Sequence, residues 1–264
     1  MKERVITAIF LLAVILPLIY FGGNWFLALM VVAASIAAWE MIAMHDLNKK
    51  IPLWIKGLTL LGTLWVVLVP ADSNLTFYDA PFISIIFATT LLVINRIRVS
   101  KDQMHIGLYP LIIFYIGFTF RALFYIRIHH LMLFIFLIVT VILTDSAAYF
   151  AGRFFGRHKL APKISPKKTV EGAIGGWLIG SAFALIFGLW QHLFTTNWLL
   201  ITLAICLPAL AQMGDLIASA FKRKYGIKDY GKLFPGHGGV MDRVDSQLLA
   251  ALLIYLITSF GGVQ

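Results

Sequence analysis

The chain has 264 residues, of which 60% are hydrophobic and only 13% are charged. Soluble domains are on average about half apolar and about a quarter charged, so this composition excludes an ordinary soluble enzyme and predicts one integral membrane domain over residues 1–264. The single cysteine, Cys206, excludes an intramolecular disulfide and a multi-cysteine metal cluster. The formal net charge of +10 requires an explanation of its own.

The predicted fold is an all-α bundle of membrane-spanning helices. A bilayer core about 30 Å thick requires about 20 apolar residues per helix. The stretch after Met1 has no small-residue cleavage site, so we expect a retained first helix rather than a signal peptide. We divide the chain into N-terminal helices, 1–140, and catalytic helices with their loops, 141–264. About nine spans are predicted, at 5–21, 24–44, 53–70, 80–96, 107–126, 131–151, 173–194, 197–218 and 243–260.

The basic residues predict the orientation of these spans. With a cytoplasmic N-terminus, the nine-span topology places 20 of the 22 lysines and arginines on the cytoplasmic side, as the positive-inside rule requires. Topology therefore explains the net charge, and a nucleic-acid partner is not needed. The last two cytoplasmic loops carry more basic residues than orientation requires, which predicts an anionic partner such as a lipid phosphate or a nucleotide.

Three carboxylates within the predicted spans stand out. A carboxylate in a membrane helix costs several kcal/mol unless it is paired or hydrated, so Asp145, Asp215 and Glu40 are candidates for a functional role. For Glu40 two interpretations stay open, because its carboxylate can also reach the headgroup region or pair with a lysine.

Asp215 has polar neighbours at helical spacing. Ser219 follows four residues later, and Lys222 and Arg223 follow at seven and eight, so all four share one helix face. This stripe predicts a site for phosphates and a metal ion. A helix end with a solvated basic collar is the alternative interpretation.

The glycine-rich segment 235–239 predicts a tight backbone that can approach a ligand closely. Asp242 and Asp245 follow it, three residues apart, and are predicted to lie near the N-terminus of a helix, where either can coordinate a cation. His237 lies within the glycine-rich segment. It suggests acid–base work, a phosphate contact, or a hydrogen bond that holds the loop.

The loop before the predicted seventh span suggests a second phosphate site. Ser165 followed by Pro166 is typical of a helix start, with the serine as the cap. We therefore expect Lys167, Lys168 and Thr169 in the first helical turn, where exposed amides attract phosphate. Two lysines there oppose the helix dipole, so an anionic ligand is expected to offset them.

These residues form a pattern that resembles a known family. The sequence reads SAFKR at 219–223, KD at 228–229 and FPGHGGVMDRVD at 234–245, which is similar to the complete signature of phosphatidate cytidylyltransferases. DSAAY at 145–149 and SPKKTVEG at 165–172 also resemble blocks of that family. The resemblance covers about residues 144–245 and says little about the first 140 residues.

The resemblance implies a function. A bacterial inner-membrane enzyme would transfer CMP from CTP to phosphatidic acid, giving CDP-diacylglycerol and pyrophosphate for phospholipid biosynthesis. It would have a polar cavity open to the cytoplasm and would require Mg²⁺, with a monovalent cation such as K⁺ as a further candidate. Asp215 and Asp242 would hold the metal, and Asp145 and Asp245 are weaker candidates for that role.

The remaining polar residues are assigned to the substrates. Lys222, Arg223, Lys167 and Lys168 are expected to neutralise phosphates, and Ser165, Thr169 and Ser219 to donate hydrogen bonds to them. The other predicted substrate-binding residues are Lys228, His237 and Arg243.

Two rival functions are weighed against this one. A CTP-dependent lipid kinase would release CDP instead of pyrophosphate. A secondary transporter is favoured by the number of spans but often shows repeats in both halves, whereas here the unusual polar residues gather in the C-terminal half. Oligomeric state stays open, with a homodimer among the alternatives.

Overall fold

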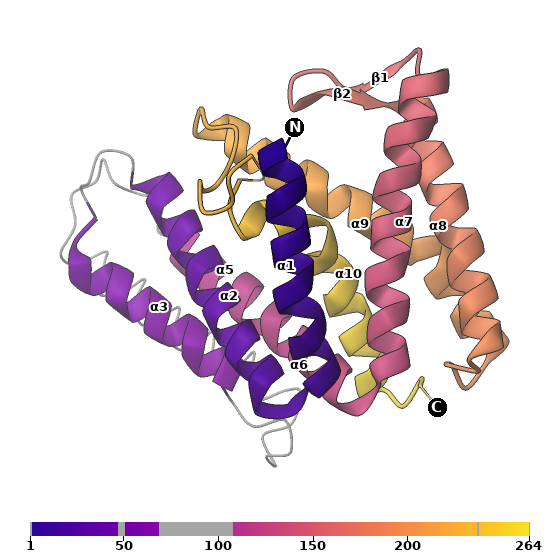
Figure 1. The fold of residues 1–264 in the computed structure, drawn as a ribbon, viewed down its shortest axis with the longest axis horizontal. Helices are drawn as coiled ribbons and strands as arrows, with labels where there is room; N and C mark the ends of the chain where they lie inside the picture. The colour runs from indigo at the N-terminus through magenta and orange to yellow at the C-terminus, as the bar shows by residue number, and fades with distance from the viewer. Residues whose placement is uncertain (1, 47–50, 69–107, 237, 264) are drawn as a thin grey trace. The chain divides into compact units, whose positions relative to one another are not determined.

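The computed structural model describes residues 2–46, 51–68, 108–236 and 238–263, and most of them are helical (Figure 1). The chain divides into two compact units. The first unit contains residues 1–125 and 229–243, and the second contains residues 126–228 and 244–264.

The first unit is built on N-terminal helices. Helix α2 packs against α1 and α3, and α3 packs against the π-helical turn η2. Small side chains on α2, at Ala34, Ala37 and Ala38, are fully buried and allow this packing. The elements are α1 (Lys2–Phe21), α2 (Gly23–His45), α3 (Leu53–Leu68), α5 (Leu108–Ile112), η2 (Ile113–Gly117) and the first part of α6 (Phe118–His129).

The second unit carries a helical layer and a short hairpin. Helix α7 packs along α8, α8 packs against α9, and an antiparallel two-stranded sheet joins α7 to α8 (Figure 1). Helix α10 begins in the first unit and continues in the second. The elements are α7 (Leu131–Phe155), β1 (Lys159–Ala161), β2 (Ser165–Thr169), α8 (Val170–Trp190), α9 (Asn197–Lys224) and α10 (Met241–Ser259).

Glycines spaced four residues apart bring α8 close to α7. Gly172, Gly176 and Gly180 are buried on one face of α8. A side chain at Gly176 would meet the backbone oxygen of Thr144 and the methyl group of Ala148. Small residues at this spacing are a common means of packing membrane helices, where close backbone approach replaces the hydrophobic driving force.

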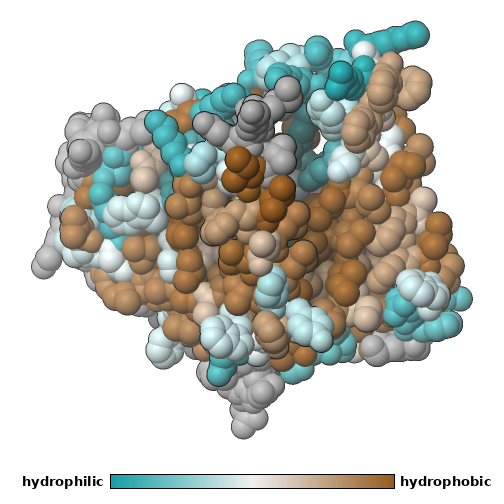
Figure 2. Space-filling view, viewed as in Figure 1, coloured by the Kyte–Doolittle hydropathy of each residue, from teal (hydrophilic) through white to brown (hydrophobic). Residues whose placement is uncertain are grey.

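Large apolar side chains cover the outer faces of these helices. On α8, Ile186 is 70% exposed and Trp190 is 71% exposed, and Figure 2 shows a continuous apolar surface over α7 and α8. Exposed apolar area of this extent marks a surface that meets lipid. Among the described residues, five helical segments are long and apolar enough to cross a bilayer: Gly23–His45, Tyr109–His129, Leu131–Phe155, Val170–Trp190 and Asn197–Lys224.

Eight of the nine ranges predicted as spans coincide with helical segments, and the fourth, 80–96, lies outside the described residues. The prediction of a mostly helical membrane protein is confirmed. The predicted number of spans is not confirmed. Over the described residues, α1, α3 and α10 do not reach the length and hydropathy that a bilayer crossing needs. The hairpin also departs from the all-α prediction.

The prediction of a helix starting at Ser165 is wrong. Residues 165–169 form strand β2, with Thr169 paired to Lys159, and the helix begins at Val170. Thr169 is the N-cap, because its hydroxyl accepts the Gly172 N–H at 3.1 Å. Both serine and threonine are good caps, and pairing with β1 decided between them. The lysines before Thr169 therefore precede the helix and do not oppose its dipole.

Candidate active site

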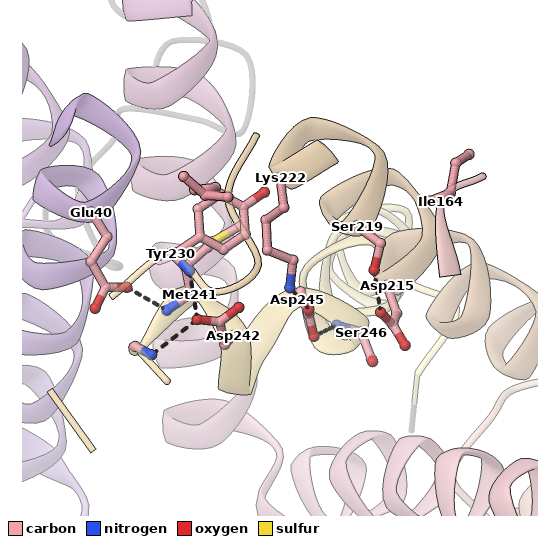
Figure 3. Close-up of polar contacts among 12 residues, drawn as sticks. Glu40, Ile164, Asp215, Ser219, Lys222, Tyr230, Met241, Asp242, Asp245 and Ser246 are labelled. Atoms are coloured by element: carbon pink, nitrogen blue, oxygen red, sulfur yellow. Dashed lines mark hydrogen bonds and ion pairs between the residues drawn. The ribbon is translucent and has the colours of Figure 1, made fainter. Parts of the chain in front are cut away.

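Asp215 is the centre of a polar group in the second unit. Its Oδ2 pairs with the Lys168 ammonium at 2.6 Å. Its Oδ1 accepts the Ser219 hydroxyl at 3.2 Å (Figure 3). Lys168 comes from β2 and Ser219 from the next turn of α9. The Asp215 and Lys168 side chains are each 28% exposed, so both remain accessible to a ligand. The structure therefore brings three predicted site residues together.

Asp145 joins this group from α7. It lies ten residues before the end of α7, its side chain makes a hydrogen bond with Ser246, and it is within electrostatic range of Asp215 and Lys168. Asp145 is exposed although the helix around it is apolar. Ser246 is not among the residues predicted from the sequence, and its position next to Asp245 was the available signal. We call Asp145, Lys168, Asp215, Ser219 and Ser246 the Asp215 cluster.

A second ion pair links α9 to α10. The Lys222 ammonium lies 3.8 Å from Oδ2 of Asp245, and both side chains are 10% exposed (Figure 3). A side chain at Gly214 would meet the Asp245 backbone oxygen, so this glycine permits the close approach of the two helices. Asp245 Oδ1 also accepts the Ser246 N–H at 2.9 Å. Asp245, a weaker metal candidate, thus has a lysine partner.

The Arg223 side chain donates hydrogen bonds to backbone carbonyl groups in this structure. Its Nε donates to the Ile164 carbonyl at 3.1 Å, and its Nη1 donates to the Ile227 carbonyl at 3.1 Å. The first contact links the hairpin loop to the end of α9. The second contact holds the turn that follows α9 against the end of that helix. The guanidinium is exposed, so contact with a phosphate remains sterically open.

Asp242 lies in the first unit, at the start of α10. Its buried carboxylate accepts two backbone N–H groups on Oδ2, from Tyr230 at 2.8 Å and Gly239 at 3.0 Å (Figure 3). Asp242 therefore holds the segment 229–239 in a defined conformation. Its predicted position near a helix N-terminus is confirmed.

Glu40 acts on the same loop from α2. Its buried carboxylate accepts the Val240 N–H at 3.1 Å and the Met241 N–H at 2.9 Å (Figure 3). In place of the lysine partner that the sequence offered for Glu40, the structure has two backbone N–H groups. Val240 has no side-chain oxygen to cap α10, and the Glu40 carboxylate supplies the acceptor instead.

The other predicted residues are distributed around the two units. The Thr169 hydroxyl is buried at the start of α8, whereas the side chain of Ser165 on β2 is half-buried. His237 lies outside the described residues. The exposed basic candidates are Lys167 on β2, Lys228 after α9 and Arg243 on α10.

The carboxylates suit a metal ion that is held jointly with a substrate. Within the described parts of the chain, no group of three or more histidine, cysteine or carboxylate side chains lies close enough together to hold a metal ion. Asp145 and Asp215 supply two carboxylates in electrostatic range of each other. Mg²⁺ is typically bound by one or two carboxylates together with substrate phosphates, so this pair fits Mg²⁺ better than an ion that needs a protein-only cage.

Comparison with known proteins identifies the family. The cytidylyltransferase family profile matches residues 2–260. The chain belongs to this family. A relative named phosphatidate cytidylyltransferase from Bacillus subtilis strain 168 is 37% identical over 268 residues, covering 97% of each chain.

Staphylococcal members of the cytidylyltransferase family are similar over the same length. Phosphatidate cytidylyltransferase of Staphylococcus saprophyticus is 34% identical over 261 residues, covering 97% of this chain and 98% of its own. That of Staphylococcus aureus strain COL is 34% identical over 268 residues, with the same coverage. Family membership therefore includes the N-terminal helices, to which the motif resemblance did not extend.

Proposed function

We propose that this protein transfers CMP from CTP to phosphatidic acid, releasing pyrophosphate and forming CDP-diacylglycerol. The observation that carries the proposal is the family match over residues 2–260, shared with relatives named phosphatidate cytidylyltransferase. The Asp215 cluster supports the proposal. It places accessible carboxylates and a lysine on or beside helices that are long and apolar enough to span a bilayer. Such a site is suited to a phosphorylated lipid substrate.

The chemistry requires positioning more than proton transfer. A phosphate oxygen of phosphatidate attacks the α-phosphorus of CTP, and the bond to pyrophosphate breaks. A phosphate monoester has a second pKa of about 6, so the nucleophile is already anionic near neutral pH and needs no general base. The main barrier is repulsion between two anions, which fixed cations lower.

The residues of the Asp215 cluster have separate roles in this proposal. Asp215 and Asp145 hold Mg²⁺ with the CTP phosphates, and Asp242 remains a proposed further ligand. A bound cation competes with Lys168 for the Asp215 carboxylate, so Lys168 turns toward a phosphate when substrate binds. When bound, Mg²⁺ neutralises charge on the phosphates. Ser219 donates a hydrogen bond, and K⁺ is a candidate for a second cation.

Orientation and location belong to the same proposal. The protein lies in the bacterial inner membrane with its N-terminus, the basic hairpin and a polar cavity facing the cytoplasm, where CTP is available. The basic character of the hairpin region supports this orientation, since Lys159, Lys163 and Lys167 are all exposed. A homodimer is compatible with the proposal but is not required by it.

The test uses CTP labelled at two positions. Purified protein in detergent receives phosphatidic acid, Mg²⁺ and either α-labelled or γ-labelled CTP. The proposal expects label in CDP-diacylglycerol from the α-position, an equimolar amount of pyrophosphate, and loss of both with EDTA. Label in a lipid from the γ-position would instead indicate a lipid kinase. Intact CTP with folded protein would contradict both functions and favour a transporter.

A further inference from the structure

Glu40 connects the N-terminal helices to residues 229–240, the segment before α10, which we call the signature loop. It lies on α2 and is 6% exposed, and its carboxylate oxygens accept the N–H groups of Val240 and Met241 at 3.1 Å and 2.9 Å. The contact joins residues about 200 positions apart within the first unit. A buried carboxylate is expensive without partners, so two charge-assisted hydrogen bonds explain how it is accommodated.

Helix α10 needs this acceptor. The first N–H groups of a helix have no partner within the helix, and the residue before the first turn usually supplies a side-chain oxygen. Val240 occupies that position before Met241 and has none. Glu40 therefore caps α10 from a different helix, and its negative charge also suits the positive end of the α10 dipole (Figure 3).

The loop before α10 is shaped around the Glu40 carboxylate. A side chain at Gly231 or at Gly239 would overlap with it. Gly239 has a backbone conformation that other residues adopt readily, so contact with Glu40 is what excludes a larger residue there. The glycine at 239 thus has a steric purpose distinct from that of Gly238, whose φ of 82° itself favours glycine.

Glu40 and Asp242 hold the same turn of backbone. Asp242 accepts the Gly239 N–H at 3.0 Å, and Glu40 accepts the N–H of the next residue, Val240, at 3.1 Å. A shift of the Val240 amide would therefore move the Gly239 donor and with it the Asp242 carboxylate. Asp245 follows one helical turn after Asp242 on α10 and depends on the same helix start.

We propose that Glu40 is a positioning residue for the cytidylyl transfer: it fixes the start of α10 and so orients Asp242 for the metal-dependent reaction. This inference rests on the proposed function. Residues that orient metal-binding carboxylates typically change metal affinity or activity by about 10–100-fold when they are replaced. The N-terminal helices thereby contribute directly to the site through α2.

The first test replaces Glu40 with glutamine and measures the Mg²⁺ dependence of turnover. Glu40→Gln keeps the size of the side chain but turns an NH₂ group toward one of the two backbone donors. The expected result is a kcat about tenfold lower per folded molecule and a Mg²⁺ concentration for half-activation about tenfold higher. A residue that only stabilised the fold would change the folded fraction and leave the Mg²⁺ response unchanged.

Asp46→Asn is the matched control. Asp46 ends the same helix, is 8% exposed, accepts the Ile51 N–H at 2.9 Å and pairs with Lys56. Both of these partners follow Asp46 closely in the sequence and are far from residues 229–240. We expect this variant to lose thermal stability and to keep the parent Mg²⁺ response.

Amide hydrogen exchange supplies a readout that needs no substrate. In Glu40→Gln, loss of the Glu40 contacts should speed amide exchange at least tenfold in a peptide that contains Val240 and Met241. In Asp46→Asn, the exchange rate of the same peptide should not change. Gly239→Ala is the second variant in case Glu40→Gln does not fold, because it keeps the carboxylate and crowds it. It should shift the Mg²⁺ response in the same direction.

The outcomes separate this inference from the proposed function. If the parent protein forms CDP-diacylglycerol while both variants keep the parent kcat, Mg²⁺ response and exchange rate, the inference is overturned and the function stands. If the parent protein forms no CDP-diacylglycerol, the function is overturned, and unchanged exchange in Glu40→Gln would also reject the capping contact.

Discussion

At the scale of single residues, the Asp215 carboxylate has a partner on each oxygen. The lysine on Oδ2 is a cation held at 2.6 Å, and the serine on Oδ1 is a neutral donor at 3.2 Å. This arrangement shows that a cation can occupy the position next to the carboxylate. In the proposed reaction, Asp215 contributes its negative charge more than its shape.

Asp215→Asn tests that contribution. The amide keeps the size of the side chain and can still accept from Ser219, but it loses the negative charge. We expect kcat for CDP-diacylglycerol formation to fall on the order of 100-fold, because electrostatic stabilisation is lost, with little change in folded yield. Radiolabelled product formation at saturating Mg²⁺ measures the effect, with Asp46→Asn as the control. Near-normal, Mg²⁺-dependent turnover would remove Asp215 from the metal site.

Thr169 offers a prediction about stability. Its hydroxyl caps α8 through the Gly172 N–H, so Thr169→Ala should cost about 1 kcal/mol of unfolding free energy, whereas Thr169→Ser should cost much less. Thermal unfolding in detergent measures both variants. The sequence assigned this hydroxyl to a substrate phosphate. An increase in KM for CTP in Thr169→Ala, without a matching loss of stability, would support that assignment against the capping role.

At the scale of elements, the hairpin and the glycine face of α8 decide where the cluster residues lie. Strand β2 carries Lys168 toward Asp215, and the loop between the strands is tied to α9 by Arg223. Gly172, Gly176 and Gly180 let α8 approach α7, the helix that carries Asp145. The close approach of these backbones thus brings together charged residues that are far apart in the sequence.

Gly176→Val tests this packing. The added side chain would meet the Thr144 carbonyl and Ala148, so overpacking should cost about 1–3 kcal/mol and separate α7 from α8. We expect a lower midpoint of thermal unfolding and reduced turnover. Gly57→Val is the control, because a side chain at that position on α3 meets nothing within 4 Å. Equal effects of the two substitutions would show that helix propensity, and not packing, determines the result.

At the scale of the whole molecule, the surrounding lipid determines most of the composition. In the part of the chain that the structure describes, five helical segments are long and apolar enough to cross a bilayer. Their outer faces carry exposed side chains such as Phe154 and Ile186. The proposed topology places the hairpin and the α8–α9 turn on opposite sides of the membrane.

Cysteine labelling tests this topology. In a Cys206→Ser background, Lys163→Cys places a thiol on the exposed hairpin loop and Thr196→Cys places one on the exposed α8–α9 turn. A membrane-impermeant maleimide should label the first only in inside-out vesicles and the second only in right-side-out cells. The reverse pattern would invert the proposed orientation, and labelling of both from one side would mean that α8 does not cross the membrane.

The sequence by itself determined the helical membrane character, the approximate helix ranges and the stripe that joins Asp215 to Ser219. These follow from local spacing and from the large cost of placing polar groups in lipid, both of which can be read along one segment. It also carried the family signature at 219–245, which the profile match over residues 2–260 confirms.

Only the tertiary structure decided which carboxylates have partners and where α8 begins. Ser165 and Thr169 are both competent caps, and the choice between them depended on pairing with β1. Glu40 was open to two interpretations because its partners lie 200 residues away on a backbone that offers no side-chain signal. Hydrogen bonds to backbone amides depend on how the chain folds back on itself. The sequence does not show which distant segments of the chain come into contact.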